Sequence, residues 1–424
     1  MSSLAADLRF RGVIHQVTDP AAEAALDRER LVCYIGFDPS AGSLHVGSLM
    51  QLCMLRRLQE AGHHPIAVAG GGTGMIGDPG GRSEERSLLT AEEVEANLAG
   101  IRPQVARFVD LGAGAKLVDN ATWLGGLSVL GFLRDVGKHF TVNQMVAKES
   151  VRTRLEGREQ GISYTEFSYM LLQAYDFLHL FDHEGCRLQV GGSDQWGNIT
   201  AGIDLIRRLR GAEAWGLTTP LVVKEDGTKF GKTEAGTVWL DPARTSPYQL
   251  HQYLVQVEDT VVGAYLRYFT WLPHDRLEAL DRAVAEAPEA REAQRVLARE
   301  VVALIHGEAE ARRAEVTAGA LFDGDLRDLD EEALLQAFAE APSSELSRAR
   351  LTADGGVGLA DLLVETGLER SRSAARRTIG QGGAYVNNRR EPDPDRHLGP
   401  GDLLVDRFLV LRRGRRGYHL VRVA

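Results

Sequence analysis

The first half of the chain alternates short apolar runs with longer stretches in which apolar residues recur at helical spacing. The apolar runs predict strands at 31–36, 64–70, 115–119, 186–191 and 220–224. The longer stretches predict helices at 46–61, 91–109, 127–137, 166–178 and 196–210. Alternating strands and helices are typical of a parallel sheet with helices on both faces. We therefore expect an α/β domain over residues 1–245.

The pattern becomes all-helical after this domain. Residues 246–322 predict only helices, one starting at Pro247 and another over 291–313. Inside the first domain, the polar segment at about 125–165 interrupts the alternation of strands and helices. We therefore expect an insertion there and a separate α-helical domain over 246–322.

The last hundred residues predict a linker and a small module. Residues 323–356 are acidic and predict a linker with one short helix over 331–340. Helices at 359–366 and 372–380, followed by short strands with turns, predict a compact α+β module over 357–424.

Composition narrows the class of protein. Apolar residues make up 44% of the chain and charged residues 25%, which is ordinary for a soluble globular protein. The longest apolar runs are shorter than the roughly 20 residues of a membrane helix, and no signal peptide is predicted. Cys33, Cys53 and Cys186 match no zinc spacing, so we expect a cytoplasmic protein without a tightly bound metal.

Charge is distributed unevenly. The chain carries a net charge of −10, yet residues 367–424 contain 13 arginines against 6 acidic residues. A basic tail on an acidic body favours an anionic partner at the carboxyl-terminal end.

The segment Pro39–Ser48 joins the first predicted strand to the first predicted helix. A strand, a glycine-containing turn and a helix N-terminus form a place to hold phosphate. His45 lies in this turn, two residues before Gly47. A histidine in such a place indicates a nucleotide whose phosphates react and are not only bound.

Gly227–Thr233 is a second candidate phosphate segment. Three residues separate its glycines where the standard phosphate loop has four, so it is not that loop. Lys229 and Lys232 would instead place two ammonium groups on a glycine-hinged segment that closes on a transferring phosphate. A solvated basic turn is the alternative.

Gly72–Gly77 matches the dinucleotide fingerprint Gly-x-Gly-x-x-Gly. The next residues, starting at Asp78 and Pro79, would break the helix that such a site requires. We also find no acidic residue about 20 positions on to hold an adenine ribose. A nicotinamide-dependent enzyme is therefore disfavoured.

The predicted helix at 166–178 carries a polar stripe. Tyr169, Gln173 and Asp176 lie within about 60° of one another on it, among large apolar residues. Polar groups in such a place need partners, which a bound polar ligand would supply. A structural network with Tyr34 or Gln189 is the alternative.

Two further places suit polar ligands. Gly192 and Asp194 end a strand at a helix start, where glycine permits close approach and the carboxylate accepts ribose hydroxyls or caps the helix. Arg372, Arg376 and Arg377 lie about one helical turn apart, which suits the phosphates of structured RNA or a solvated face.

Together these motifs resemble the bacterial tyrosyl-tRNA synthetases over essentially the whole chain. The segments around His45 and Lys229–Thr233 resemble the two phosphate signatures of class I synthetases. The tyrosine assignment depends on the segments Tyr34–Pro39, Gly70–Pro79 and Gly191–Asn198 and on the polar helix. Position 48 is Ser where that signature more often has His or Asn, and position 82 is Arg where Lys is common.

The resemblance implies a Rossmann-like catalytic domain, an anticodon-side helical domain and a basic RNA-binding domain. It implies a tyrosine–tRNA ligase that forms tyrosyl-adenylate and pyrophosphate from L-tyrosine and ATP and then charges tRNA(Tyr). ATP is a substrate that carries Mg²⁺ with it. The resemblance also implies a homodimer with its interface in the insertion. A tryptophan-specific relative and a non-catalytic RNA-binding descendant are the alternatives.

The resemblance also implies roles for single residues. The catalytic candidates are His45, Ser48, Arg82, Arg86, Lys229, Lys232 and Thr233. The tyrosine-binding candidates are Tyr34, Asp78, Tyr169, Gln173, Asp176, Gln189 and Gln195. The ATP and adenylate candidates are Gly36, Asp38, His45, Gly47, Gly192, Asp194 and Lys232. The RNA-binding candidates are Arg370, Arg372, Arg376 and Arg377.

Overall fold

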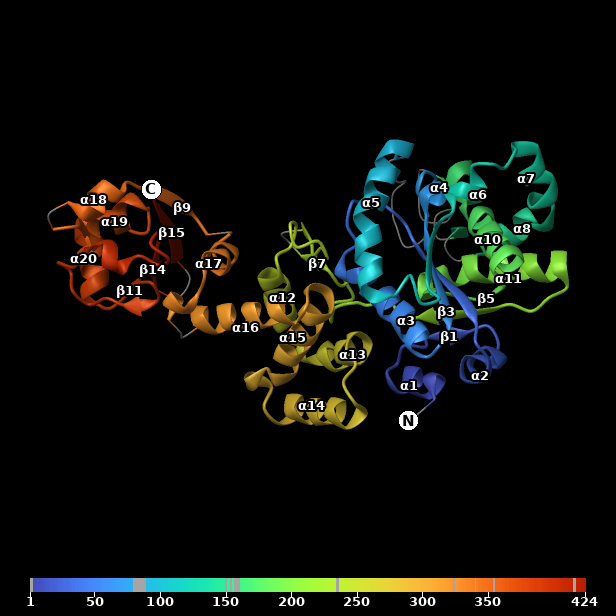
Figure 1. The fold of residues 1–424 in the computed structure, drawn as a ribbon, viewed down its shortest axis with the longest axis horizontal. Helices are drawn as coiled ribbons and strands as arrows, with labels where there is room; N and C mark the ends of the chain where they lie inside the picture. The colour runs from blue at the N-terminus through green and yellow to red at the C-terminus, as the bar shows by residue number, and fades with distance from the viewer. Residues whose placement is uncertain are drawn as a thin grey trace. The chain divides into compact units, whose positions relative to one another are not determined.

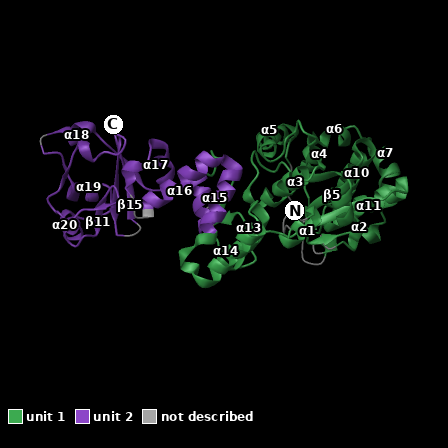
Figure 2. Ribbon diagram, turned by 60° about the horizontal axis from the view of Figure 1, so that its bottom comes forward, with its two compact units in different colours: residues 1–245, 257–293 green, residues 246–256, 294–424 purple. Residues whose placement is uncertain are grey.

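The structure is a computed structural model of the chain. It describes residues 3–78, 89–148, 151–152, 155, 161–233, 236–322, 325–339, 341–353, 355–414 and 417–424. The chain divides into two compact units (Figure 2). Unit 1 comprises residues 1–245 and 257–293, and unit 2 comprises residues 246–256 and 294–424.

Unit 1 is built on one six-stranded sheet, in the order β1-β6-β5-β2-β3-β4 (Figure 1). Its strands are β1 (Gln16–Val17), β2 (Val32–Phe37), β3 (His64–Ala69), β4 (Lys116–Asp119), β5 (Cys186–Gly192) and β6 (Trp215–Thr219). Neighbouring strands are parallel except for β1, which runs antiparallel to β6. The predicted Rossmann-like parallel sheet is confirmed.

One predicted strand is wrong. The last parallel strand is β6, which ends at Thr219, and the apolar run 220–224 lies outside the sheet. Leu221 and Val223 in that run are 45% and 37% exposed, whereas every residue of β6 is buried. Strand β6 was not predicted because its sequence, Trp-Gly-Leu-Thr-Thr, lacks a strongly apolar pattern. It is nevertheless buried, with β1 and β5 on its two sides.

Helices cover both faces of the sheet. Figure 1 shows α3 (Leu49–Glu60) and α5 (Ala91–Phe108) on one side, and α10 (Tyr164–Glu184) and α11 (Trp196–Arg210) on the other. Side chains of α10 and α11 form one buried cluster with residues of β2 and β3, including Tyr34 and Ile66. This packing presents one face of α10 to the sheet.

The predicted insertion contains short helices. Its described residues form α7 (Val129–Asp135), a 3-10 helix (Gly137–His139) and α8 (Val142–Val146), without a strand. Several large apolar side chains between positions 129 and 164 are more than a third exposed, namely Val129, Leu130, Leu133, Val142, Val146, Leu155 and Tyr164.

The helices after residue 245 fall in both units. Unit 2 contains α12 (Pro247–Val255), and unit 1 contains α13 (Asp259–Phe269) and α14 (His274–Glu286). The single helix predicted over 291–313 is wrong. Two helices stand there instead. They are α15 (Glu292–His306), which lies in unit 2 from residue 294 onward, and α16 (Glu308–Phe322), and Gly307 between them has a φ of +96° that interrupts helical geometry.

The carboxyl-terminal part of unit 2 is an α+β fold. Its five-stranded sheet has the order β12-β11-β14-β15-β9. The strands are β9 (Ser343–Leu346), β11 (Ala384–Val386), β12 (Arg389–Arg390), β14 (Phe408–Arg413) and β15 (Gly417–Val423). Helices α19 (Leu359–Glu365) and α20 (Arg372–Gly380) pack against each other and form a buried cluster with residues of the sheet.

The linker prediction fails within residues 343–346. This segment forms β9, which pairs in parallel with the last strand, β15, and buries Leu346. The sequence Pro-Ser-Ser reads as a loop because its strand conformation depends on a partner about 75 residues away. The short helix predicted in the same segment is present as α17 (Glu331–Ala337). Within the described ranges, no helix combines the length and apolar character needed to cross a membrane.

Candidate active site

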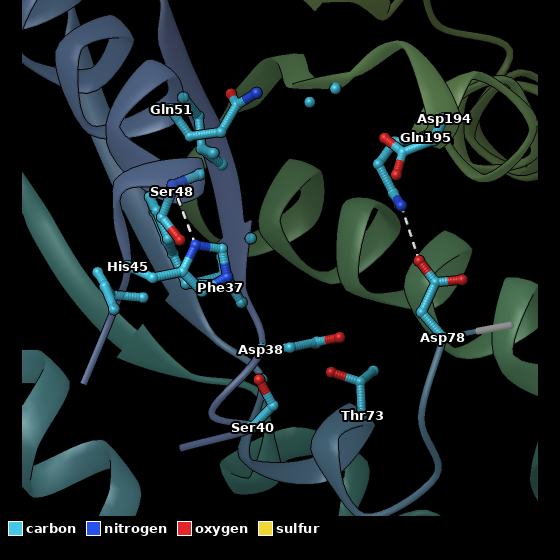
Figure 3. A pocket seen from close by; sticks show the side chains of 18 of the residues that line it. Phe37, Asp38, Ser40, His45, Ser48, Gln51, Thr73, Asp78, Asp194 and Gln195 are labelled. Carbon is cyan, nitrogen blue, oxygen red and sulfur yellow. Dashed lines mark hydrogen bonds between the residues drawn. The ribbon is translucent and has the colours of Figure 1, made fainter. Parts of the chain in front are cut away.

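A cavity of about 950 Å³ opens at the carboxyl ends of the parallel strands of unit 1 (Figure 3). Ligands of open α/β sheets bind at this edge. The residues predicted from sequence that line the cavity are Tyr34, Gly36, Asp38, His45, Gly47, Ser48, Asp78, Tyr169, Gln173, Asp176, Gln189, Gly192, Asp194, Gln195, Lys229 and Lys232. Segments almost 200 residues apart in the sequence therefore meet at one site.

One predicted catalytic residue that the structure describes, Thr233, is not among these lining residues. Thr233 lies on β7 (Lys232–Thr233), where its Oγ1 donates a hydrogen bond to the carbonyl oxygen of Gly236 at 2.9 Å. Arg82 and Arg86 lie outside the described residues.

The His45 turn fixes the imidazole at the start of α3. Nδ1 of His45 accepts a hydrogen bond from the N–H of Gly47 at 3.0 Å. The neutral ring therefore carries its proton on Nε2, which is a hydrogen-bond donor. A Cβ at position 47 would lie 2.6 Å from Cε1 of His45, so only glycine lets the ring fold over the backbone here. Ser48 also lines the cavity, and its hydroxyl makes no capping hydrogen bond within the described part of α3.

The segment Gly227–Thr233, here called the lysine segment, is anchored on α13. Val223 and Lys229 pair across a hairpin, and Phe230 directly after it is buried. The ring of Phe230 packs against Tyr265 and Phe269, with centroids 4.6 and 5.7 Å away. The Tyr265 hydroxyl donates to the carbonyl oxygen of Val223 at 2.8 Å. This anchorage holds both ends of the segment that carries Lys229.

The two candidate phosphate segments are in direct contact. Gly231 has a φ of +86°, and a Cβ there would lie 2.5 Å from Cγ2 of Val46, the neighbour of His45. After the lysine segment the chain returns beside the same turn, where His45 and Trp239 form an antiparallel bridge. The imidazole and the lysines thus belong to one assembly.

One part of the cavity suits a hydroxyl group. Asp176 is buried and accepts hydrogen bonds from Nδ2 of Asn120 at 2.9 Å and from Nε1 of Trp123 at 2.7 Å. Burial raises the pKa of Asp176 to about 7, although these two hydrogen bonds favour its charged form. The buried hydroxyl of Tyr34 has no hydrogen-bond partner among the residues that the structure describes. A ligand hydroxyl between the two would satisfy that group.

A second part of the cavity is a network of amides and carboxylates. Nε2 of Gln195 donates to Oδ2 of Asp78 at 2.7 Å (Figure 3). Oε1 of Gln195 accepts from Nε2 of Gln173 at 3.3 Å and from Nδ2 of Asn198 at 3.1 Å. The network orients acceptor oxygens, which suit an ammonium group.

Two further carboxylates, Asp38 and Asp194, line the cavity. The hydroxyl of Tyr169 donates to Oδ1 of Asp38 at 3.4 Å. Burial and the nearby charge of Asp78 raise the pKa of Asp194, whereas Lys229 lowers it. Lys229 is therefore close enough to Asp194, just before α11, to favour the charged form of that carboxylate. Figure 3 shows His45 on one side of the cavity and Asp194 on the other.

Several residues of the site were not predicted from the sequence. Asn120 follows β4 and connects three partners, since it also accepts from the N–H of Gly72 at 2.7 Å and donates to Oγ1 of Thr73 at 3.0 Å. Its position directly after a predicted strand was an available signal. Trp123 in the short helix α6 (Ala121–Leu124) and Gln51 in α3 carried no such signal. In the described residues, no group of His, Cys, Asp and Glu side chains is placed to hold a metal ion.

The arginines predicted to bind RNA are exposed in unit 2. They are Arg370, just before α20, and Arg372, Arg376 and Arg377 within it. Arg372 pairs with Asp361 at 3.0 Å and Arg376 pairs with Asp395 at 2.7 Å. These exposed pairs contribute little to stability and leave the arginines accessible.

Comparisons with known proteins identify the family. Residues 26–323 match the family described as tRNA synthetases class I (W and Y), and residues 333–421 match the tyrosine--tRNA ligase SYY-like C-terminal domain. A tyrosine--tRNA ligase of Roseiflexus castenholzii is 54% identical over 100% of both chains. That of Bacillus caldotenax is 50% identical, covering 99% of this chain and 100% of the relative. The chain belongs to the tyrosyl-tRNA synthetases.

Solved structures agree with this membership. A truncated mitochondrial tyrosyl-tRNA synthetase of Aspergillus nidulans is 31% identical with a TM-score of 0.67, covering 76% of this synthetase and 95% of that chain. A Plasmodium falciparum tryptophanyl-tRNA synthetase shares the fold at 14% identity and a TM-score of 0.53, covering 78% and 87%. The predicted resemblance is confirmed, and the full-length relatives named here favour tyrosine over tryptophan.

Proposed function

We propose that the cavity in unit 1 is where this synthetase joins L-tyrosine to ATP and from which the tyrosyl group passes to tRNA(Tyr). Membership of the family makes the chain a tyrosine–tRNA ligase with ATP as a substrate. The assignment of the site depends on one observation above all. The His45 turn and the lysine segment line the same cavity as the Tyr34–Asp176 pair.

The first step needs positioning and charge stabilisation. The carboxylate of tyrosine attacks the α-phosphorus of ATP, the new P–O bond forms, and the bond to the pyrophosphate oxygen breaks. A carboxylate is already a nucleophile, so the step requires no general base. Nε2 of His45, the hydroxyl of Ser48 and the ammonium groups of Lys229 and Lys232 supply donors and positive charge to the phosphates. Thr233, Arg82 and Arg86 are proposed to assist, and Mg²⁺ enters with the nucleotide.

Selection of tyrosine follows from the hydroxyl-binding part of the cavity. The phenol of the substrate donates to Asp176 and accepts from Tyr34, while Gln189 borders the same space. Phenylalanine would leave Tyr34 unpaired, and an unpaired buried polar group costs about 1–3 kcal/mol. Tyrosyl-tRNA synthetases are the standard example of rejection by this means.

The remaining residues divide between the two substrates. Asp78, Tyr169, Gln173 and Gln195 hold the ammonium group of tyrosine through the oriented oxygens described above. The ATP-binding residues are proposed to be Gly36, Asp38, Gly47, Gly192 and Asp194. At Gly36, no described atom lies within 4 Å of where a Cβ would stand, so the strand leaves room for a ligand.

Larger parts of the chain also have proposed roles. Residues 1–245 form the catalytic domain, residues 246–322 the anticodon-side domain, and the module from 357 onward binds tRNA through its arginines. The exposed apolar side chains between 129 and 164 are proposed to form a homodimer interface, because several large apolar side chains exposed within one short segment suit association with another chain. The proposed location is the cytoplasm.

ATP–pyrophosphate exchange driven by each amino acid in turn tests this function. Tyrosine is expected to drive exchange strongly, and phenylalanine and tryptophan weakly or not at all. Lys232→Ala is expected to slow exchange while tyrosine binding stays unchanged. Exchange driven equally by tryptophan, or no exchange with tyrosine, would contradict the proposal.

A further inference from the structure

One face of α5 supports the turn that carries His45. Nδ2 of Asn97 donates to the carbonyl oxygen of Pro39 at 2.9 Å, at the start of that turn. A Cβ at Gly100 would overlap the carbonyl oxygen of Gly42, so the backbone of α5 packs directly on the turn. Asn97 and Gly100 are three residues apart and therefore lie on the same face of the helix. No residue of α5, which the structure describes throughout, lines the cavity, so this face influences the site through the turn that it contacts.

Gln104 lies four residues further along the same face and holds the turn with both ends of its amide. Oε1 accepts a hydrogen bond from the N–H of Leu44 at 2.8 Å. Nε2 donates to Oγ of Ser43 at 2.9 Å. Ser43 and Leu44 are buried, and Leu44 directly precedes His45 in the chain. Two hydrogen bonds from one planar group fix both the position and the orientation of the backbone beside the imidazole.

Ser43 links this contact to the chain that returns from the lysine segment. Its hydroxyl accepts a second hydrogen bond, from the N–H of Asp241 at 3.2 Å, and donates to the carbonyl oxygen of Leu44 at 2.7 Å. The same carbonyl oxygen accepts from the N–H of Leu240 at 2.9 Å. A hydroxyl has one donor and two acceptor positions, so these bonds use the full capacity of Ser43. Ser43 lines the cavity, yet its hydroxyl is committed to holding the site together.

We infer that Gln104 is a positioning residue: through Ser43 and Leu44 it fixes the imidazole of His45 relative to the lysine segment. The inference rests on the proposed function, in which both groups act on the triphosphate of one ATP. Such groups are effective only when they are held within a fraction of an ångström of the productive geometry. Both hydrogen bonds described for Gln104 go to this turn, whereas tyrosine is proposed to bind elsewhere in the cavity. Loss of the amide is therefore expected to slow the chemical step without weakening tyrosine binding.

Gln104→Leu tests the inference, because leucine is of similar size and removes both hydrogen bonds. The kcat of tyrosine-dependent pyrophosphate exchange is expected to fall about 10- to 100-fold, as for a small displacement of catalytic groups, while the KM for tyrosine stays unchanged. Gln59→Leu is the matched control. Gln59 on α3 also bonds through both ends of its amide, to the N–H and the carbonyl oxygen of Asp110 away from the cavity, so its variant is expected to keep the native kcat.

A double-mutant cycle with Ser43→Ala tests the route. Ser43→Ala removes a single hydroxyl and is itself expected to lower the kcat, and Gln104→Leu is expected to lower it much less in that background than in the native protein. Ser43→Ala also carries the test if Gln104→Leu does not fold. The inference would be overturned by a native kcat in either variant, additive losses in the double variant, an equal loss in Gln59→Leu, or a loss of tyrosine affinity that matches the loss of rate. Absence of tyrosine-dependent exchange in the native protein would instead contradict the proposed function.

Discussion

Nε1 of Trp123 donates a hydrogen bond of 2.7 Å to Oδ1 of Asp176. The Trp123 ring also stacks on His179, with centroids 4.4 Å apart and planes inclined by 14°. His179 lies three residues after Asp176 on α10, so the helix that carries the carboxylate also holds its donor. The orientation of the buried carboxylate is thus set within one small group of side chains.

Replacing Trp123 by phenylalanine removes the donor and keeps an aromatic ring. In the native protein this hydrogen bond favours the charged carboxylate. Its loss is therefore expected to raise the pKa of Asp176 above about 7. Near neutral pH more of Asp176 is then protonated and no longer accepts a charged hydrogen bond from the phenol of tyrosine. Tyrosine affinity is expected to fall roughly tenfold, because such a bond is worth about 1.5–3 kcal/mol. Calorimetric titration with tyrosine at several pH values measures both effects. Trp271→Phe, which removes an indole bonded to Glu60 on the surface, is the control.

Asp176 also gives the ligand-free protein a characteristic dependence of stability on pH. Its ordinary pKa is 3.8 and burial raises it to about 7. Between these values the native state binds a proton that the unfolded state has released, so stability is expected to fall as the pH rises through this window. Asp176→Asn is expected to flatten the fall, as measured by urea unfolding at several pH values. Equal slopes for the two proteins would show that the carboxylate is not raised in this way.

His251 on α12, in unit 2, has the opposite effect on the pH dependence of stability. It is buried, neither ring nitrogen has a partner among the described residues, and burial lowers its pKa from 6.5 to about 4. Its neutral form is favoured by folding, so the stability present above pH 6.5 is expected to decline as the pH falls toward 4. His251→Leu is expected to lessen this acid sensitivity in urea unfolding. The same change at the exposed His183 should leave it unaltered.

The contact between Gly231 and Val46 predicts a large effect of one methyl group. Gly231→Ala would place a Cβ 2.5 Å from Val46 at a φ of +86°. We expect adenylate formation to slow about 100-fold, because a small displacement of catalytic groups has effects of this size. Gly227→Ala shares a positive φ of +78° but meets no described atom within 4 Å, so it controls for backbone strain alone. Similar exchange rates in the two variants would mean that the contact does not position the lysines.

Reversing the charge of Arg377 tests the role of the exposed arginines. Arg377→Glu is expected to weaken tRNA charging several-fold and to reduce its dependence on salt, because fewer counterions are released on binding. Pyrophosphate exchange is expected to remain normal. Arg207→Glu makes the same charge change on the exposed face of α11 in unit 1 and serves as the control. Loss of both activities in Arg377→Glu would count against a separate RNA-binding role.

The local pattern of the chain predicted most helices and the first four strands of the parallel sheet. Helices α11 and α20 begin and end at the predicted residues, because caps and glycines mark their ends in the sequence. Strand β9 could not be predicted in this way. Its four residues, which include Ser343 and Ser344, acquire their conformation from β15.

Residues of the candidate site could be predicted where they belong to a recognisable motif. His45, Lys229 and the stripe on α10 were found because their spacing is unusual for a purely structural segment. Asn120, Trp123 and Gln51 were not found, because their roles depend on contacts with side chains 50 or more residues away. Such contacts leave no periodic signal in one sequence.

The support of the lysine segment by α13 bears on synthesis of the chain at the ribosome. All strands of the parallel sheet have emerged once residue 219 has left the exit tunnel, and Lys229 follows soon afterwards. Tyr265 and Phe269, which flank Phe230, emerge only about 35 to 40 residues later. A nascent chain that pauses between these points contains the complete amino-acid pocket. Its lysine segment, however, still lacks the two aromatic side chains of α13 that hold it in place.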